Sequence, residues 1–312
     1  MPEPGNEIER WADEAMFGAT PMQGQETPGG EFRVVPKVYL LSASPDPLGS
    51  VAAAFRMYGG TPTFDLNDVT DDERNWAWQE SLKTHLKAPW EFIDLHFFIE
   101  GVTRAFTHQI VRQRTAVYAQ ESLRFAVKEG MAREVAYPPA IVGNELAKNF
   151  WVQTVREIER AYSALVNMGI PAEDARGLLP HCTTTRLNYK TNFRGLIEHA
   201  GNRLCTQAQF EWRAVFIGII QAIRDYEPLP RWARGLDEGN AWQFQILAQP
   251  LAQTFTPVCY KAGRCVFMGD LDRGCTIRER VNDGRFDDID PMEWMADPMA
   301  GITDDSNPRP NA

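Results

Sequence analysis

The sequence lacks long hydrophobic runs. No stretch comes near the roughly 18 consecutive apolar residues that a membrane-spanning helix needs. Residues 1–15 are acidic and have neither the basic nor the apolar region of a secretory signal peptide. We therefore expect a cytoplasmic protein with no membrane partner.

Cysteine and histidine are scarce. The chain has five of each, the cysteines are widely spaced, and no two of them form a CxxC pair. An odd number of dispersed cysteines favours reduced thiols over a disulfide framework. A zinc site on Cys259, Cys265 and Cys275 is a weaker interpretation than buried or idle thiols, so we expect no metal.

Several common motifs are also missing. No GxGxxG follows a predicted strand, there is no Walker loop, and no serine sits in a GxSxG elbow. A Rossmann dinucleotide site is thereby disfavoured. The formal net charge of -10 disfavours nucleic acid as a partner, because an acidic chain is repelled by a phosphate backbone.

The composition is that of a soluble globular protein, with 44% apolar and 24% charged residues in 312. We expect a loose N-terminal extension at 1–32, a main domain at 33–230 and an acidic C-terminal extension at 231–312. Helices and strands intermix without a βαβ rhythm, which predicts an α+β fold. After a short apolar run at 34–41, strands are expected at 91–101 and 183–191, and helices at 50–58, 67–86, 103–113 (capped by Thr103), 142–168, 171–179 and 192–225.

Arginine is concentrated in a few places. Arg112 and Arg114 flank Gln113 at a predicted helix end, and Gln120, Ser122 and Arg124 follow shortly after. Guanidinium groups pair bidentately with phosphate, so this spacing indicates an anion site. The alternative is a solvated basic patch.

Two further elements carry arginines. Arg203 lies among apolar residues of the predicted helix 192–225, and Arg176 precedes the predicted strand at 183. An unpaired buried charge is costly, so Arg203 should have an anionic partner. Arg194 has an internal alternative, an ion pair with Glu198 one turn away. Six arginines in three elements suggest a pocket for anionic ligands such as nucleotide phosphates.

The segment RQRTAVYAQES at 112–122, followed by Arg124, resembles the signature of the flavin-dependent thymidylate synthases. DDERN at 71–75 and PWEF at 89–92 have counterparts upstream, as does a helix carrying Gln109. ARGLLP at 175–180 and NFRGLIEHAGNRLCTQAQFEW at 192–212 resemble downstream elements of that family. The resemblance covers roughly 50–225.

This resemblance implies an α+β homotetramer with an antiparallel-rich sheet, active sites between subunits, and a catalytic flavin-dependent methylase domain at 33–230. It implies FAD and NADPH as cofactors and 5,10-methylenetetrahydrofolate as carbon donor, for C5-methylation of dUMP to dTMP. Ser122 and Arg124 would hold the nucleotide phosphate, Gln109 and Gln120 the sugar and phosphate, and Arg176 and Arg203 the uracil. The implied FAD residues are His85, Glu91, Arg112, Gln113, Arg114, Asn192, Arg194 and Asn202.

The implied mechanism needs no cysteine nucleophile. Our hypothesis is that Arg203 polarises the uracil carbonyl, with Ser122 as the second catalytic residue, while the flavin performs the redox chemistry.

The chain departs from the family signature at five positions: Gln113 for histidine, Val117 for serine, Ala119 for asparagine, Gln120 for glutamate and Phe125 for tyrosine. A glutamine can donate and accept, so Gln120 could tolerate a 2′-hydroxyl. This leaves two alternatives: the same reaction on UMP, as in polyoxin-type nucleoside antibiotic pathways, and a catalytically silent flavin- or nucleotide-binding relative.

Overall fold

The computed structural model describes residues 25–27, 31–33, 36–128, 130–205, 208–228, 241–254 and 257–259. The strands are β1 (Gln25–Thr27), β2 (Glu31–Arg33), β3 (Lys37–Ala43), β4 (Asp94–Thr103), β5 (Val117–Gln120) and β6 (Thr184–Asn192). The α-helices are α2 (Pro47–Tyr58), α3 (Asp71–Lys83), α4 (Arg104–Ile110), α5 (Pro139–Val142), α6 (Glu145–Asn167), α7 (Ala172–Ala175), α8 (Phe193–Arg203), α9 (Glu211–Arg224) and α10 (Ala241–Thr254). Within these ranges no helix has both the length and the apolar character needed to cross a membrane.

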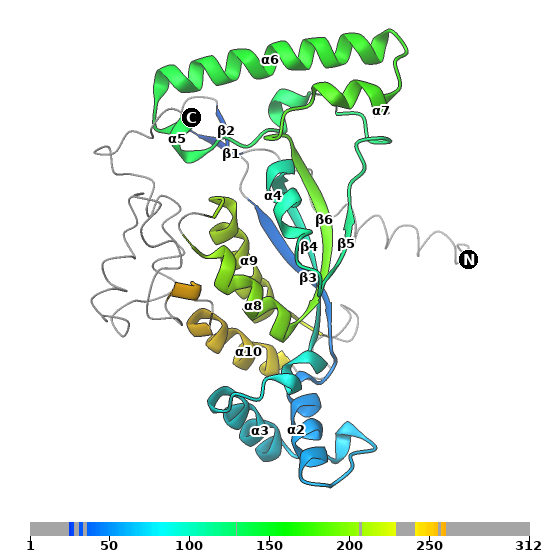
Figure 1. Ribbon diagram of the computed structural model, residues 1–312, viewed down its shortest axis with the longest axis vertical. Coiled ribbons are helices and arrows are strands. Elements are labelled where there is room, and N and C mark those ends of the chain that lie inside the picture. Colours follow the sequence, from blue (N-terminus) through cyan, green and yellow to red (C-terminus); the bar gives the residue numbers. More distant parts are fainter. Residues whose placement is uncertain are drawn as a thin grey trace, which may run out of the picture.

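An antiparallel sheet with the strand order β3-β4-β6-β5 runs through the middle of the molecule (Figure 1). The longest pairing joins β4 to β6, from Asp94 opposite Asn192 to Thr103 opposite Thr184. Its register shifts beside Gly101, whose φ of 73° is readily adopted only by glycine. The predicted α+β class with an antiparallel-rich sheet is confirmed.

One face of the sheet is packed and the other is largely open. Leu95, Phe97 and Ile99 of β4 are fully buried in the same core cluster as residues of α8 and α9. The two helices lie to the left of the sheet in Figure 1. The alternate positions of the central strands carry the more exposed His96, Phe98, Arg186 and Lys190. This period of two is what a strand with one buried face requires.

The prediction of a single helix at 192–225 is wrong, because the segment forms two helices, α8 and α9, joined by a non-helical connection. The carboxylate of Glu211, the first residue of α9, turns inward and accepts hydrogen bonds from the backbone N and Oγ1 of Thr103, both at 2.7 Å. These long-range bonds override local helix propensity. Asn192 caps α8 by accepting from the backbone N of Gly195.

Other predicted boundaries shift by a few residues. Helix α3 begins at Asp71 rather than at 67, because Thr70 and Glu73 form a capping box there. Strand β4 begins at Asp94, after a 3₁₀ turn at Ala88–Phe92. Thr103 caps α4 as predicted, whereas strand β5 was not predicted at all.

The two predicted extensions also contain ordered elements. Strands β1 and β2 form an antiparallel pair that overlaps the predicted loose segment 1–32. Helix α10 packs against α9 with Phe244, Leu247 and Leu251 fully buried. The predicted boundary at residue 230 therefore falls inside the packed unit. Cys265 and Cys275 of the disfavoured zinc site lie outside the described residues.

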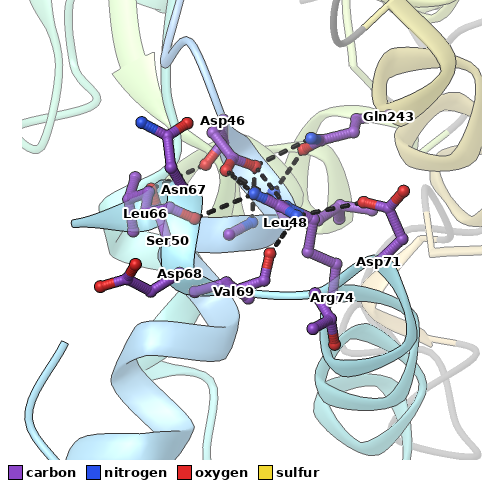
Figure 2. A network of polar contacts seen from close by, with 12 residues as sticks. Asp46, Leu48, Ser50, Leu66, Asn67, Asp68, Val69, Asp71, Arg74 and Gln243 are labelled. Carbon is purple, nitrogen blue, oxygen red and sulfur yellow. Dashed lines mark hydrogen bonds and ion pairs between the residues drawn. The ribbon is translucent and has the colours of Figure 1, made fainter.

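A buried polar network joins α10 to the N-terminal end of α2 and to α3 (Figure 2). Asp46 pairs with Arg74 at 2.6 Å and accepts from Gln243 Nε2 at 2.8 Å. Gln243 Oε1 in turn accepts from the backbone N of Leu48 at 2.9 Å. Burial alone would raise the pKa of Asp46, but the hydrogen bonds from Arg74, Gln243 and Gly49 outweigh burial and lower it.

We predict that Arg74→Ala destabilises the fold by about 3–5 kcal/mol, because it leaves a buried carboxylate without its counter-ion. Chemical denaturation at pH 7 measures this loss. Since the folded-state pKa of Asp46 is depressed, its contribution is present above the ordinary aspartate pKa of about 3.9 and disappears as pH falls through the lowered value.

The matched control is Lys83→Ala, which removes an exposed ion pair with Glu80 on the same helix. Its denaturation midpoint should equal that of the unmodified protein. Equal midpoints for both variants would contradict a structural role for the Asp46–Arg74 pair.

Candidate active site

The loop between α4 and β5 is fixed by Gln113. Its Nε2 donates to Thr191 Oγ1 at 3.2 Å and to the carbonyl oxygen of Gly195 at 3.1 Å. Its Oε1 accepts from the hydroxyl of Tyr189 at 2.7 Å. The Gln113 side chain thus points into the protein and joins the loop to β6 and α8.

Arg112 and Arg114, on either side of Gln113, are exposed. In the part of the chain that the structure describes, neither guanidinium makes an ion pair or a hydrogen bond. Two uncompensated cations on an anchored loop suit an anionic ligand.

Arg203, at the end of α8, is half-buried and also lacks a carboxylate partner among the described residues. Its Nε lies 3.4 Å from His199 Nε2, and one terminal nitrogen lies 3.5 Å from the carbonyl oxygen of Gln109. Its guanidinium carbon lies 5.3 Å from the ring centre of Trp212. Burial, and then the nearby charge of Arg112, lower the pKa of Arg203.

The side-chain amide of Gln109 is hydrogen-bonded to neighbouring residues of the protein. Its Nε2 donates to Gln209 Oε1 at 3.0 Å, and its Oε1 accepts from Trp212 Nε1 at 3.0 Å. Gln209 Nε2 donates onward to Glu211 at 2.6 Å. The backbone carbonyl of Gln109 thus lies beside Arg203, and the contact of its side chain with a sugar stays a prediction.

Arg194 has the internal partner that the sequence allowed, and a second one. Its Nε donates to Glu198 at 2.8 Å, and another nitrogen donates to Glu91 at 2.7 Å. Glu91 and Arg194, both predicted to bind FAD, are thus brought together as an ion pair. Asn202 is exposed and its amide lies 3.5 Å from the Glu198 carbonyl oxygen. His85 lies exposed after α3, with no described contact to this group.

A second arginine group lies where α4 meets the beginning of β6. Arg124 pairs with Glu173 at 3.0 Å, and Arg176 Nε donates to the carbonyl oxygen of the same residue at 3.1 Å. Glu173 therefore brings together two predicted substrate residues that are distant in sequence.

Arg104 belongs to this group, and the sequence analysis missed it. It is half-buried, and burial followed by the charge of Arg176 lowers its pKa, while the carboxylate of Glu121 opposes that fall. Its position offered a signal: it directly follows the cap Thr103, and a cation is unfavourable in the first turn of a helix. An arginine at this position indicates that an anion lies nearby to compensate its charge.

A turn after β5 presents Ser122. The Ser122 carbonyl accepts from the backbone N of Phe125 and Ala126, and its hydroxyl oxygen accepts from the backbone N of Arg124 at 3.3 Å. The buried Lys128 clamps this turn by pairing with Glu121 at 3.1 Å and Glu134 at 2.6 Å. The predicted Ser122 and Arg124 are thus held on a supported loop.

Gln120 lies at the end of β5, and its Nε2 donates to Thr107 Oγ1 at 2.9 Å. The Thr107 hydroxyl gives its own hydrogen to the Arg104 carbonyl at 3.0 Å, so it can only accept from Gln120. The amide orientation is thereby fixed. Gln120 Oε1 makes no hydrogen bond within the described residues and is available as an acceptor.

Comparison with known proteins bears on this arrangement. The family model described as thymidylate synthase complementing protein matches residues 39–229. Flavin-dependent thymidylate synthase of Geobacter sulfurreducens is 32% identical over 195 residues, covering 62% of this chain and 84% of the relative. That of Nitratidesulfovibrio vulgaris is 34% identical over 211 residues, covering 63% and 85%.

The chain belongs to the flavin-dependent thymidylate synthase family. The fold agrees: the crystal structure of thymidylate synthase X from Helicobacter pylori with FAD and dUMP matches with a TM-score of 0.51 at 17% identity. That match covers 69% of this chain and 99% of the other. The family match ends near residue 229, so α10 lies beyond it.

Family membership gives meaning to the departure at Gln113. Where the signature has a histidine, this chain has an amide whose donor and acceptor are both used internally. Its hydrogen bonds to Tyr189, Thr191 and Gly195 anchor the loop between α4 and β5, which carries Arg112 and Arg114. The prediction that Gln113 binds FAD directly stays a prediction, but its polar atoms already have partners.

We predict that Gln113→Leu lowers the free energy of unfolding by about 1–3 kcal/mol, because buried polar groups of β6 and α8 lose their partner. Urea denaturation measures the change. Gln79→Leu, at an exposed position of α3, is the matched control and should change stability little. Comparable losses in the two variants would rule out the anchor.

Proposed function

We propose that this protein methylates C5 of dUMP, giving dTMP, with 5,10-methylenetetrahydrofolate as carbon donor and NADPH as reductant. In the balanced reaction, dUMP, methylenetetrahydrofolate, NADPH and a proton give dTMP, tetrahydrofolate and NADP⁺. The observation that carries the proposal is Arg203: a half-buried guanidinium without a carboxylate partner among the described residues, in a chain of this family.

The arginine group around Arg104, Arg124 and Arg176 would bind the nucleotide phosphate, and Arg203 would bind the uracil. The charge of Arg176 lowers the pKa of Arg104, and Glu121 acts in the opposite direction. Because Glu121 is already paired with Lys128, the two arginines suit a phosphate. Ser122 and Arg124, on the turn supported by Lys128, extend the same group. Arg203 would then polarise a uracil carbonyl, stabilising negative charge as C5 becomes nucleophilic.

The residues present fit a flavin dinucleotide. Arg112 and Arg114 are exposed cations without described partners, as the pyrophosphate of FAD requires. Arg194 contributes less charge, because Glu91 and Glu198 neutralise it. Bound FAD would supply the two-electron chemistry that converts the transferred carbon to a methyl group. We include the homotetramer of the family in the proposal, which sedimentation of the FAD-loaded protein tests.

Cysteine chemistry is not needed at C6 of the pyrimidine. Burial raises the pKa of Cys182 to about 11, so its thiol is protonated at neutral pH and is a poor nucleophile. Cys205 lies just after Arg203 in sequence and serves as the comparison in the test below.

The test of the function is product formation by the FAD-loaded protein with NADPH and methylenetetrahydrofolate, followed by mass spectrometry. Methylated dUMP that disappears when the folate is omitted supports the proposal. Absence of product from protein that retains FAD contradicts it and leaves a catalytically silent flavin- or nucleotide-binding relative.

We predict that Arg203→Gln lowers kcat/KM for dUMP by about 10²–10³, the usual loss when one charge-stabilising donor is removed. Cys205→Ala should retain activity. Steady-state kinetics of both variants, with FAD content and thermal stability checked, decide the matter. A folded but inactive Cys205→Ala protein would instead support a thiol nucleophile.

A second candidate substrate is UMP, and the acceptor of Gln120 favours it. With its amide nitrogen held by Thr107, Gln120 offers a fixed oxygen to a sugar hydroxyl. If that hydroxyl is the 2′-OH, Gln120→Leu lowers the UMP-to-dUMP ratio of kcat/KM by about 3- to 10-fold, as expected for one neutral hydrogen bond. Parallel assays on the two nucleotides measure the ratio, and an unchanged ratio excludes this contact.

A further inference from the structure

A buried histidine lies directly against Arg203. His199 is one helical turn before it on α8, is only 7% exposed, and presents Nε2 to the Arg203 Nε at 3.4 Å. Arginine can only donate, so Nε2 must be the unprotonated nitrogen. The imidazole proton is therefore on Nδ1, which is buried and has no hydrogen-bond partner in the described part of the chain.

The ring is confined by aromatic neighbours. Trp212 meets it edge-on at 4.9 Å between ring centres, and Phe216 does so at 6.3 Å. Trp212 also lies under the Arg203 guanidinium and is itself held through Nε1 by Gln109. His199 and Trp212 thus form a floor under Arg203, which we call the neutral floor.

The neutral floor contrasts with the surroundings of Arg194 on the same helix. Arg194 is held by two carboxylates, which cancel much of its field. Arg203 is held instead by an uncharged acceptor and an indole. Burial, and then the charge of Arg203, lower the pKa of His199 to about 4, so the ring is neutral at physiological pH. An arginine held this way keeps its full positive charge for a ligand.

We propose that His199 is a positioning residue that orients Arg203 without neutralising it, so that the remaining guanidinium N–H groups face the uracil carbonyl. This inference rests on the proposed function. A role in packing alone does not account for the imidazole, because its Nδ1–H is buried with no acceptor among the described residues, which destabilises the fold. A phenylalanine would fill similar space without that penalty.

The test compares His199→Phe, His199→Gln and His199→Asn in the FAD-loaded enzyme. In His199→Phe the acceptor is lost and Arg203 can rotate, so kcat/KM for dUMP should fall about 10- to 100-fold while thermal stability stays equal or rises. Glutamine carries a neutral acceptor that reaches the Nε2 position, so His199→Gln should recover most of the activity. Asparagine is too short to reach it and should not.

The control is Ile223→Ala, which removes buried apolar volume on α9 about two turns beyond Phe216. It should lower stability and leave kcat/KM for dUMP unchanged. Parallel falls of stability and activity in every His199 variant would overturn the positioning role. If His199→Phe does not fold, the glutamine and asparagine pair decides: equal activity of these two overturns it.

Calorimetric titration with dUMP distinguishes failure of the proposed function from failure of the role of His199. An unmodified enzyme that neither binds nor methylates dUMP or UMP overturns the proposed function. An unmodified enzyme that methylates dUMP, together with an unaffected His199→Phe, overturns the role of His199 alone. Weaker dUMP binding by His199→Phe, restored by His199→Gln, in an unmodified enzyme that methylates dUMP, supports both.

Discussion

The active-site side of this protein depends on one buried carboxylate. Glu211 is 1% exposed, and it accepts from Thr103, at the junction of β4 and α4, and from Gln209. Burial raises its pKa, and the three hydrogen bonds oppose that rise. Through Gln209 this carboxylate orients Gln109, which in turn holds Trp212 beneath Arg203. The break between α8 and α9, the position of α4 and the surroundings of Arg203 are thus parts of a single arrangement.

The arginines of this chain fall into two kinds according to how their charge is balanced. Arg74 and Arg194 are paired with carboxylates. Arg203 has neutral hydrogen-bond partners and the cation of Arg112 nearby, and Arg104 lies near a second cation, Arg176, and near the carboxylate of Glu121. Sequence position does not separate these kinds, since Arg194 and Arg203 share one helix. The difference lies in what neighbouring elements bring to each guanidinium.

Much of the fold could be predicted from the sequence where local rules decide. The cap at Thr103 and the alternation along β6 depend on short stretches of the sequence. The missed features depend on distant partners. The helix at 192–225 is interrupted because Glu211 bonds to a residue 108 positions earlier, and β5 forms because it can pair with β6. Helix α10 is apolar enough to be buried, but no local pattern shows which core it joins.

The candidate site shows the same division. The spacing of Arg112, Ser122, Arg176 and Arg203 pointed to one site, and the structure brings Arg124 and Arg176 together on Glu173. The sequence could not reveal that the side chains of Gln109 and Gln113 bond within the protein, because a glutamine at a given position can bind either a ligand or a neighbouring element. Arg104 was missed because a single arginine after a helix cap belongs to no motif.

The network at Asp46 has a consequence for the order in which the chain can be completed during synthesis. Chains generally fold from the N-terminal side as they emerge. Here α2 and α3 can form their Asp46–Arg74 pair early, but the Gln243 amide that completes the shell around Asp46 is 197 positions further on. The contacts of Asp46 and Leu48 with Gln243 can form only after α10 has been synthesised. Completion of this network therefore depends on a helix that lies outside the residues matched by the family model.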